Sequence, residues 1–513
     1  MKTAKGNGVA TRWATPIGLL LLLIICGTAS SVEVGESELL AAAAKGDKTR
    51  VFAIIQAGTN INADAVNVGT ALHQAAAHGH IDLADALIRA GADIDAKQRS
   101  SWIPSLAITP LQIAARAGQT RIVTVLINAG ARLEADKKGD RGALHFAVLN
   151  GWGGNVETVE ALIRAGAKVV ATDRGRTTPL HVATRGASLD VIEALIKAGA
   201  DIEAVDKMGM TPLHCAASYG NADTLQVLLD AGANTELHRG YEKRTPLLFA
   251  VKQNKQAVVS ALITHGADLE ARDSDKRTAL HIVGGWKITD NDDSREARAR
   301  APDEMISLLA KAGANLEARN HRQRTPLHDA ALLNHPAGAA ALIKAGADIE
   351  ATDDRQHTPL HVAASGRSQQ VSALLVKAGA NVGAVDAEGQ TPLHLTSPNG
   401  NVETVQLLLY SGALIEAHDK QNRTALHRAA NWSSHAIVAG LLERGANIEA
   451  RTTAGDTPLH LAAVAHDRTA IEALVAAGAS SEAKDGKGRT PLDVATGDGR
   501  TKAIDWLKNA AGQ

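Results

Sequence analysis

A short phrase that returns at a fixed interval constrains this chain more than any other feature. Thr-Pro-Leu-His occurs six times, and Thr-Ala-Leu-His, one substitution away, occurs three times. The nine copies begin at Thr70, Thr178, Thr211, Thr278, Thr325, Thr358, Thr391, Thr424 and Thr457. From Thr325 to the related start at Thr490, every step is 33 residues. A constant period of this length indicates a repeat architecture, in which one structural unit is copied and stacked.

The chemistry of one copy predicts two helices and a turn. In the copy from Thr178, threonine is a good N-cap and the proline after it suits the first helical position. A second apolar stretch with Val191 and Leu195 predicts an amphipathic helix. Gly199 then accepts a left-handed C-cap, and residues 201–209 are expected to form an extended turn. One such unit cannot bury its own apolar face, so it must stack on its neighbours.

These motifs resemble the ankyrin-repeat family. Its pattern of Thr-Pro-Leu-His-x-Ala-Ala, a leucine-rich helix, Ala-Gly-Ala-Asp or Ala-Gly-Ala-Asn and a turn extends over residues 37–513. The resemblance implies an all-α repeat fold, an ankyrin-repeat α-solenoid with β-turn fingers and a concave face. Fourteen repeats are expected, with starts at Ser37, Thr70, Thr109, Gly142, Thr178, Thr211, Thr245, Thr278, Thr325, Thr358, Thr391, Thr424, Thr457 and Thr490.

Residues 1–30 stand outside the repeats. Three basic residues precede an apolar run at residues 17–26, and small residues follow it. This order predicts a secretory signal peptide that is cleaved after Ala29 or Ser30. The protein is therefore expected to be secreted or periplasmic.

Two alternatives to cleavage remain open. Residues 13–32 are uncharged and could be retained as a membrane anchor, which would make the protein a membrane-anchored scaffold. Lipid attachment at Cys26 is a further alternative. After cleavage only Cys215 would remain, so no intrachain disulfide is expected.

Charge and motifs exclude several classes of function. Lys and Arg number 54 against 55 Asp and Glu, so no global charge favours nucleic acid or an anionic membrane. The sequence contains no dinucleotide or phosphate-binding glycine motif, no Gly-x-Ser-x-Gly, no His-Glu-x-x-His and no Cys-x-x-Cys. We therefore expect no enzymatic activity and no cofactor.

The histidines do not predict a metal site. Ten of the 20 share the fourth position of the phrase. Copies at this phase lie about a helix diameter apart, too far to share a zinc ion. The family resemblance implies instead that this histidine makes hydrogen bonds between repeats.

Arginine often precedes the phrase, which could create a basic stripe for an acidic partner. The same fingers carry Asp and Glu, so ion pairing within the fingers is the favoured interpretation. The arginines are Arg141, Arg244, Arg277, Arg324, Arg423 and Arg489.

Two insertions interrupt the period. Six extra residues lengthen a finger at 98–108, where Trp102 could contact a partner or fold back onto its own repeat. Fourteen extra residues fall at 284–303, between two helices, with Trp286 near their start. Mixed charge there predicts a solvated loop, with a docking loop as the alternative, before a helix restarts at Pro302.

Candidate partner contacts follow from soft and aromatic residues that the repeat does not explain. Met208, Met210 and Tyr241 lie on neighbouring fingers and are expected to line the concave face. With Trp102 and Trp286 they form the predicted contact set. The sequence thus predicts a non-enzymatic protein-binding scaffold whose partner is a protein.

Overall fold

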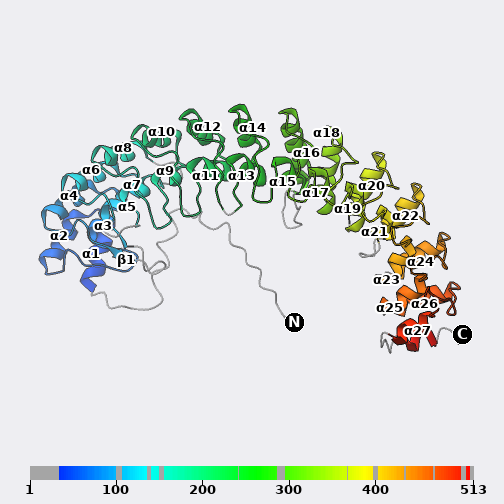
Figure 1. Cartoon of the computed structure of the whole chain (residues 1–513). Coiled ribbons are helices and arrows are strands. Elements are labelled where there is room, and N and C mark those ends of the chain that lie inside the picture. The colour runs from blue at the N-terminus through cyan, green and yellow to red at the C-terminus, as the bar shows by residue number, and fades with distance from the viewer. Residues whose placement is uncertain are drawn as a thin grey trace. The chain divides into compact units, whose positions relative to one another are not determined.

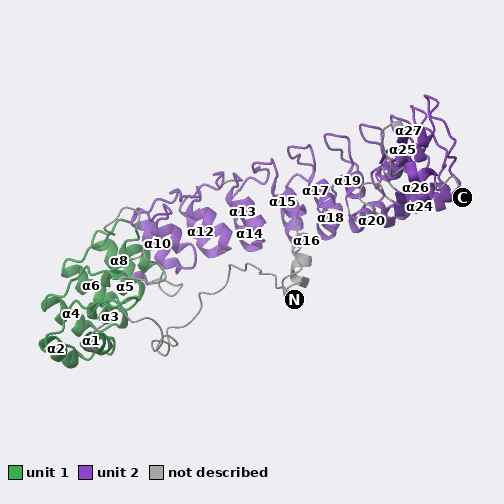
Figure 2. Cartoon of the chain, turned by 90° about the horizontal axis from the view of Figure 1, so that it is seen from below, with its two compact units in different colours: residues 1–151, 157–168 green, residues 152–156, 169–513 purple. Residues whose placement is uncertain are grey.

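The computed structural model is built of paired helices joined by turns. It falls into two units, residues 1–151 with 157–168 and residues 152–156 with 169–513, which Figure 2 distinguishes by colour. The residues that the structure describes are 34–99, 107–135, 140–149, 155–240, 242–285, 295–366, 368–396, 402–432, 435–465, 468–497 and 504–508. The predicted signal peptide or anchor therefore lies outside the described residues.

The first unit contains eight of the helices that the structure describes, and one short hairpin. They are α1 (Val34–Ala44), α2 (Lys48–Gln56), α3 (Ala71–His78), α4 (Ile81–Arg89), β1 (Gln98–Arg99), β2 (Ala107–Ile108), α5 (Pro110–Arg116), α6 (Thr120–Asn128), α7 (Ala143–Ala147) and α8 (Val156–Arg164). Within this unit α1, α3, α5 and α7 pack in one row, and α4 packs beside α6 in the other (Figure 1).

The second unit repeats the same plan from α9 to α27. Its helices are α9 (Pro179–Ala183), α10 (Leu189–Lys197), α11 (Pro212–Tyr219), α12 (Ala222–Asp230), α13 (Pro246–Lys252), α14 (Gln256–Thr264), α15 (Ala279–Gly284), α16 (Arg295–Lys311), α17 (Pro326–Leu332), α18 (Pro336–Ala345), α19 (Pro359–Ser365), α20 (Gln369–Lys377), α21 (Pro392–Leu395), α22 (Val402–Tyr410), α23 (Ala425–Asn431), α24 (His435–Glu443), α25 (Pro458–Ala465), α26 (Arg468–Ala476) and α27 (Pro491–Gly497). Residues 504–508 are also helical. Odd-numbered helices pack on odd-numbered ones and even-numbered on even-numbered ones (Figure 1).

The constant period of the sequence places small and branched residues in the core. In the repeat that starts at Thr178, Leu180, Ala183, Val191 and Leu195 are fully buried. Alanine on the first helix lets neighbouring helices approach, while the leucines of both helices fill the space between repeats. The all-α repeat solenoid expected from the sequence is confirmed.

The threonine and histidine of the phrase join each repeat to the next. Thr178 Oγ1 lies 2.8 Å from His181 Nδ1, and His181 Nε2 lies 2.9 Å from the carbonyl oxygen of Met210 in the next finger. A carbonyl only accepts, so Nε2 donates and Nδ1 accepts from the threonine hydroxyl. The predicted hydrogen bond between repeats is therefore confirmed. It recurs at His73, His214, His281, His328, His361, His394, His427 and His460.

Burial sets the charge of these histidines. It lowers the pKa of His214, His281 and His328 to about 4, well below the ordinary value for imidazole. The neutral form fits the observed hydrogen bonds, because the imidazolium ion has no acceptor for the threonine hydroxyl. The same lowering to about 4 occurs at His361 and His427.

Two of the internal repeats replace this histidine, and they do so in different ways. Gln112 keeps both functions, because its side-chain oxygen accepts from the Thr109 N–H at 2.9 Å and its nitrogen donates to the Arg141 carbonyl at 2.9 Å. Leu248 keeps neither, since its fully buried side chain has no polar atom. The repeat of α13 thus reaches its successor without this hydrogen bond.

The first insertion forms a hairpin at its base. β1 and β2 pair antiparallel, with Gln98 opposite Ile108 and Arg99 opposite Ala107. Trp102 lies outside the described residues, so its predicted contact stays a prediction.

The second insertion corrects one expectation. Helix α16 begins at Arg295, seven residues before Pro302, where the sequence predicted its start. Residues 295–301 of the predicted loop are therefore an N-terminal extension of the helix. Among the described residues, no helix is long and apolar enough to cross a lipid bilayer.

Candidate functional site

Most fingers of the second unit are tight turns, each organised by one aspartate carboxylate. Asp353 Oδ1 accepts from the backbone N–H groups of Arg355 and His357, both at 2.9 Å. The same two bonds, to the second and fourth residues after the aspartate, close the fingers at Asp206, Asp273, Asp386, Asp419 and Asp485. These fingers therefore share the same turn hydrogen bonds regardless of which residues occupy their tips.

Backbone hydrogen bonds also tie neighbouring fingers together in the second unit. The Asp354 N–H donates to the Arg322 carbonyl at 3.2 Å, and the Ala387 N–H donates to the Arg355 carbonyl at 3.0 Å. Equivalent bonds follow at Lys420, Thr453 and Gly486. Because both partners are backbone groups, the row of fingers forms a fixed frame that presents variable side chains.

The arginines before the phrase are engaged in ion pairs with the finger carboxylates. Arg277 lies 2.8 Å from Asp273, Arg423 lies 2.7 Å from Asp419 and Arg489 lies 2.8 Å from Asp485. These three carboxylates are almost fully buried. The predicted pairing within the fingers is confirmed at these positions, so these arginines support the fingers rather than offering free charge.

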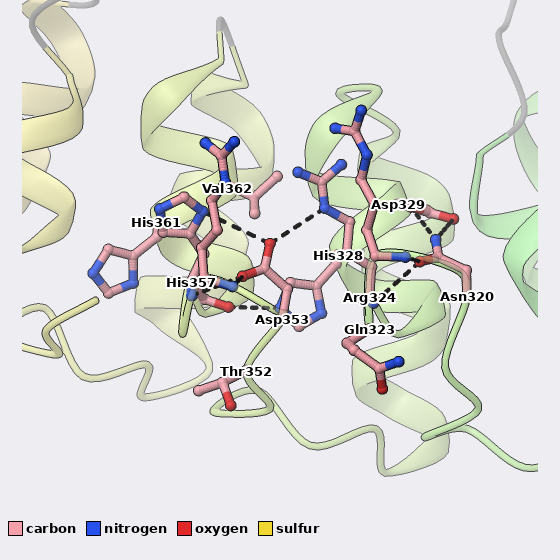
Figure 3. A network of polar contacts seen from close by, with 12 residues as sticks. Asn320, Gln323, Arg324, His328, Asp329, Thr352, Asp353, His357, His361 and Val362 are labelled. Atoms are coloured by element: carbon pink, nitrogen blue, oxygen red, sulfur yellow. Dashed lines mark hydrogen bonds and ion pairs between the residues drawn. The ribbon is translucent and has the colours of Figure 1, made fainter. Parts of the chain in front are cut away.

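In the finger between α18 and α19, a histidine replaces that arginine (Figure 3). His357 Nε2 lies 3.3 Å from Asp386 Oδ2 in the next finger, and Nδ1 lies 3.7 Å from Asp353 Oδ2. Arg324 of the preceding finger approaches the same Asp353 at 3.4 Å. Asp353 and Asp386 are each 1% exposed, so the cluster links three consecutive fingers through buried carboxylates.

The electrostatics of this cluster favour a charged imidazole. Burial alone would lower the pKa of His357, but the hydrogen bonds and charges of Asp353 and Asp386 outweigh it and raise that pKa to about 9. Burial likewise opposes ionisation of Asp353, yet hydrogen bonds from His357 and the backbone hold its pKa below the ordinary value. His357 is therefore an imidazolium ion between the carboxylates of Asp353 and Asp386, unlike the neutral histidines of the Thr-Pro-Leu-His phrase.

The neighbouring finger carries an amide where others carry the carboxylate. Asn320 Oδ1 accepts from the Arg322 N–H at 2.9 Å, while its Nδ2 donates to both oxygens of Asp329 at 3.2 and 3.3 Å (Figure 3). Burial raises the pKa of Asp329 on α17 to about 6. With no carboxylate of its own, this finger leaves Arg324 to pair with the next one.

The predicted contact residues have different outcomes. Met208 is 61% exposed at a finger tip, as a contact residue needs to be. Met210 is only 7% exposed, its carbonyl accepts from His181 and its sulfur packs beside Gly240, so its expected place on the exposed face is wrong. Tyr241 and Trp286, like Trp102, lie outside the described residues, and binding by any of the five stays a prediction.

Two exposed aromatic side chains were not predicted as contact residues. Tyr219, at the end of α11, is 48% exposed, with the Arg185 guanidinium 5.6 Å from its ring centroid. Trp432, after α23, is 49% exposed, with Arg428 at 6.0 Å. Both stand eight residues after a capping threonine, so the signal that could have found them is an aromatic at this phase of the period.

No metal or nucleophile emerges from the described residues. Among them, no group of three or more His, Cys, Asp or Glu side chains could hold a metal ion. Burial raises the pKa of the half-buried Cys215 to about 12, which disfavours the reactive thiolate.

Comparison with known families agrees with this architecture. The family models described as "Ankyrin repeats (3 copies)" match residues 104–173, 154–239, 297–386, 341–419 and 360–452. "Ankyrin repeats (many copies)" matches residues 72–127, and "Ankyrin repeat" matches 242–274 and 454–486. More than half of the chain is covered, so the protein belongs to the ankyrin-repeat family.

One solved structure illustrates the similarity at the level of sequence. The ankyrin-repeat domain of Bcl-3, a member of the IkappaB family, is 32% identical over 46% of this chain and 100% of its own, with a TM-score of 0.38. No curated protein matches the chain.

Proposed function

We propose that this protein is a non-enzymatic scaffold of fourteen ankyrin repeats that binds a partner protein through its fingers and the adjoining concave face. The observation that carries the proposal is the finger row itself. Backbone hydrogen bonds join most neighbouring fingers of the second unit, while the tips differ in charge and polarity. A rigid frame with variable side chains suits recognition, because little conformational entropy is lost when a partner binds.

Site-specific photo-crosslinking in the native host tests this proposal. A photoreactive residue placed at Met208, on an exposed tip, is expected to capture a defined protein partner. The same group at Glu193, which is exposed on α10 away from the fingers, serves as the control. Equal capture at both positions, or none at Met208, would contradict binding through the fingers.

Export by a signal peptide forms the second half of the proposal. It is supported by the basic, apolar and small-residue order of residues 1–30. Intact mass and N-terminal sequence of the protein from soluble, membrane and external fractions test it. A soluble chain that begins near Ser30 is expected. A membrane-bound chain that retains residues 17–26 would favour the alternative, an anchored scaffold.

The absence of enzymatic activity is proposed on the lack of any catalytic motif in the repeats. Reproducible turnover of a hydrolase substrate panel by the purified chain, lost on heat unfolding, would overturn this part. The scaffold proposal does not depend on it.

A further inference from the structure

The basic residues of the fingers are concentrated in one part of the second unit. Five consecutive fingers, at residues 172–177, 205–210, 238–244, 272–277 and 319–324, hold twelve Lys and Arg against five Asp and Glu. The whole chain carries a formal net charge of −1. A local excess of this size on a neutral protein creates a positive field over one surface.

Each of these five fingers exposes at its tip a basic side chain that forms no ion pair with the described residues. The residues are Arg176, Lys207, Lys243, Lys276 and Arg322, here called the tip stripe. Within the part of the chain that the structure describes, none of the five forms an ion pair. The arginines nearby, such as Arg244 and Arg277, are instead paired with Glu242 and Asp273. The stripe therefore carries positive charge that the carboxylates of the fingers do not neutralise.

Backbone conformation gives a second, independent observation. One tip position has positive φ in fingers throughout the second unit, and Gly209, Gly389, Gly455 and Gly488 adopt this conformation without steric cost. Arg176, Lys243 and Lys276 occupy the same position with φ of 57°, 49° and 57°. Gln323, Gln356 and Asn422 adopt the same conformation in other fingers, so this strain belongs to the finger turn, and three of the five basic fingers place a charged side chain at it.

We propose that the tip stripe binds an extended acidic segment of the partner protein, an inference that rests on the function proposed above. Helices that pack side by side lie about 8–10 Å apart, so neighbouring tips have about the same spacing. An extended peptide advances about 3.3 Å per residue. One carboxylate at every third residue would therefore meet one basic tip in each finger, and exposed Met208 would add apolar contact beside Lys207.

The spacing argues against nucleic acid as the occupant. Duplex DNA carries one charge per about 1.7 Å of axis, far denser than the stripe, and binding of single strands relies on aromatic stacking. Aromatic residues make up 2% of the sequence. The excess of basic residues ends at the finger at 352–357, which holds two Asp against one Arg, and the finger after it, at 385–390, exposes Glu388 and carries no basic residue.

The test uses the full chain and a fluorescent peptide of about fifteen residues with glutamate at every third position among Gly and Ser. The variant R176G/K243G/K276G removes three charges at left-handed positions. The matched control Q323G/Q356G/N422G makes the same backbone change at three other left-handed positions, with φ of 56°, 60° and 58°, without altering charge. Anisotropy is expected to show at least about a tenfold loss of affinity in the charge variant and no loss in the control.

Three further readouts make the result specific. Both variants are expected to keep or raise the thermal midpoint, because glycine relieves the left-handed strain. A peptide with its five glutamates clustered is expected to bind more weakly than the spaced one. Equal affinity of charge variant and control, or tighter binding of a duplex DNA of equal charge, would overturn the proposal.

Crosslinking at Met208 separates this inference from the proposed function. If the Met208 adduct persists while the spaced peptide fails to bind, the scaffold stands and the tip stripe is wrong. If neither is observed, the proposed function itself is contradicted.

Discussion

The first five fingers of the second unit and the two that follow use one backbone for opposite purposes. The fingers at 172–324 place basic side chains on exposed tips without acidic partners. The fingers at 352–357 and 385–390 hold four Asp and Glu against one Arg, and two of these carboxylates are buried against His357 and Arg324. The buried carboxylates of the second group connect fingers, while the first group adds exposed basic side chains that form no ion pair with the described residues. In a repeat protein, equivalent positions can therefore be divided between cohesion and recognition.

Removal of a carboxylate that connects fingers should lower the stability more than any other change proposed for these fingers. Asp353→Ala would leave Arg324 and His357 without their shared partner, and loss of one member of a buried ion pair costs about 3–5 kcal/mol. The control Asp354→Ala, at an exposed tip in the same finger, should change stability by less than about 0.5 kcal/mol. Urea unfolding of both variants measures the difference, and similar midpoints would show that the cluster is not cohesive.

Acid should weaken the array without regard to the type of finger. The pKa of His328 is lowered to about 4 by burial, so its stabilising contribution is fully present above the unfolded value of about 6.5 and is lost as pH falls toward 4. His328→Gln should retain the hydrogen bonds, as Gln112 does, and cost about 1 kcal/mol or less at pH 7.5. Its stability relative to wild type should then rise between pH 6.5 and 4.5. A constant difference across this range would contradict the neutral assignment.

Alkali should weaken only the connecting fingers. The pKa of His357 is raised to about 9, so its contribution is fully present below about 6.5 and is lost as pH rises through 9. Wild type should therefore lose about 1 kcal/mol relative to His357→Gln between pH 7 and 9.5, after allowance for solvent screening. Thermal unfolding across this range measures the loss. Parallel curves for the two proteins would show that the imidazolium contributes nothing.

Substitutions at the tip position with positive φ should change stability least. They should stabilise a finger of the basic group at 172–324 and destabilise a finger of the group at 352–390. Lys276→Gly should stabilise the fold by about 0.5–1 kcal/mol, because the lysine adopts φ of 57° there. Gly389→Lys should destabilise it by a similar amount, since that glycine has φ of 77° and an added Cβ would lie 3.2 Å from the Lys420 backbone nitrogen. Chemical denaturation measures both changes in stability. Stabilisation by Gly389→Lys would show that a side chain is not strained at this position.

Much of the fold could be predicted from the sequence because local rules and the period agree. Thr178 caps a helix, Pro179 begins it and His181 bonds to the next repeat, so one phrase determines both local and neighbouring contacts. The start of α16 was missed because proline usually marks the first turn of a helix, since in the interior it lacks an N–H donor and clashes with the preceding turn, yet α16 continues through Pro302. Proline alone does not reveal whether such an extension exists.

The candidate surface was harder to predict. Met210 was expected on the surface, yet the contact beside Gly240 comes from the next finger and is not encoded in the spacing of the phrase. His357 could have been noticed as an exception at an arginine position, but its partner Asp386 lies 29 residues away. Exposure and pairing across repeats are tertiary properties, so periodicity identifies the frame better than the contacts.

Leu248 gives the array a particular weak point. Because it replaces the histidine that would bond to the next repeat, the junction between the repeats of α13 and α15 is held with one fewer side-chain hydrogen bond than its neighbours. In a one-dimensional stack, nearest-neighbour coupling decides where cooperative unfolding is interrupted. This junction, between Lys243 and Lys276, is where a molecule stretched from its ends is expected to part. A partner bound to both tips would hold the two repeats together across this junction.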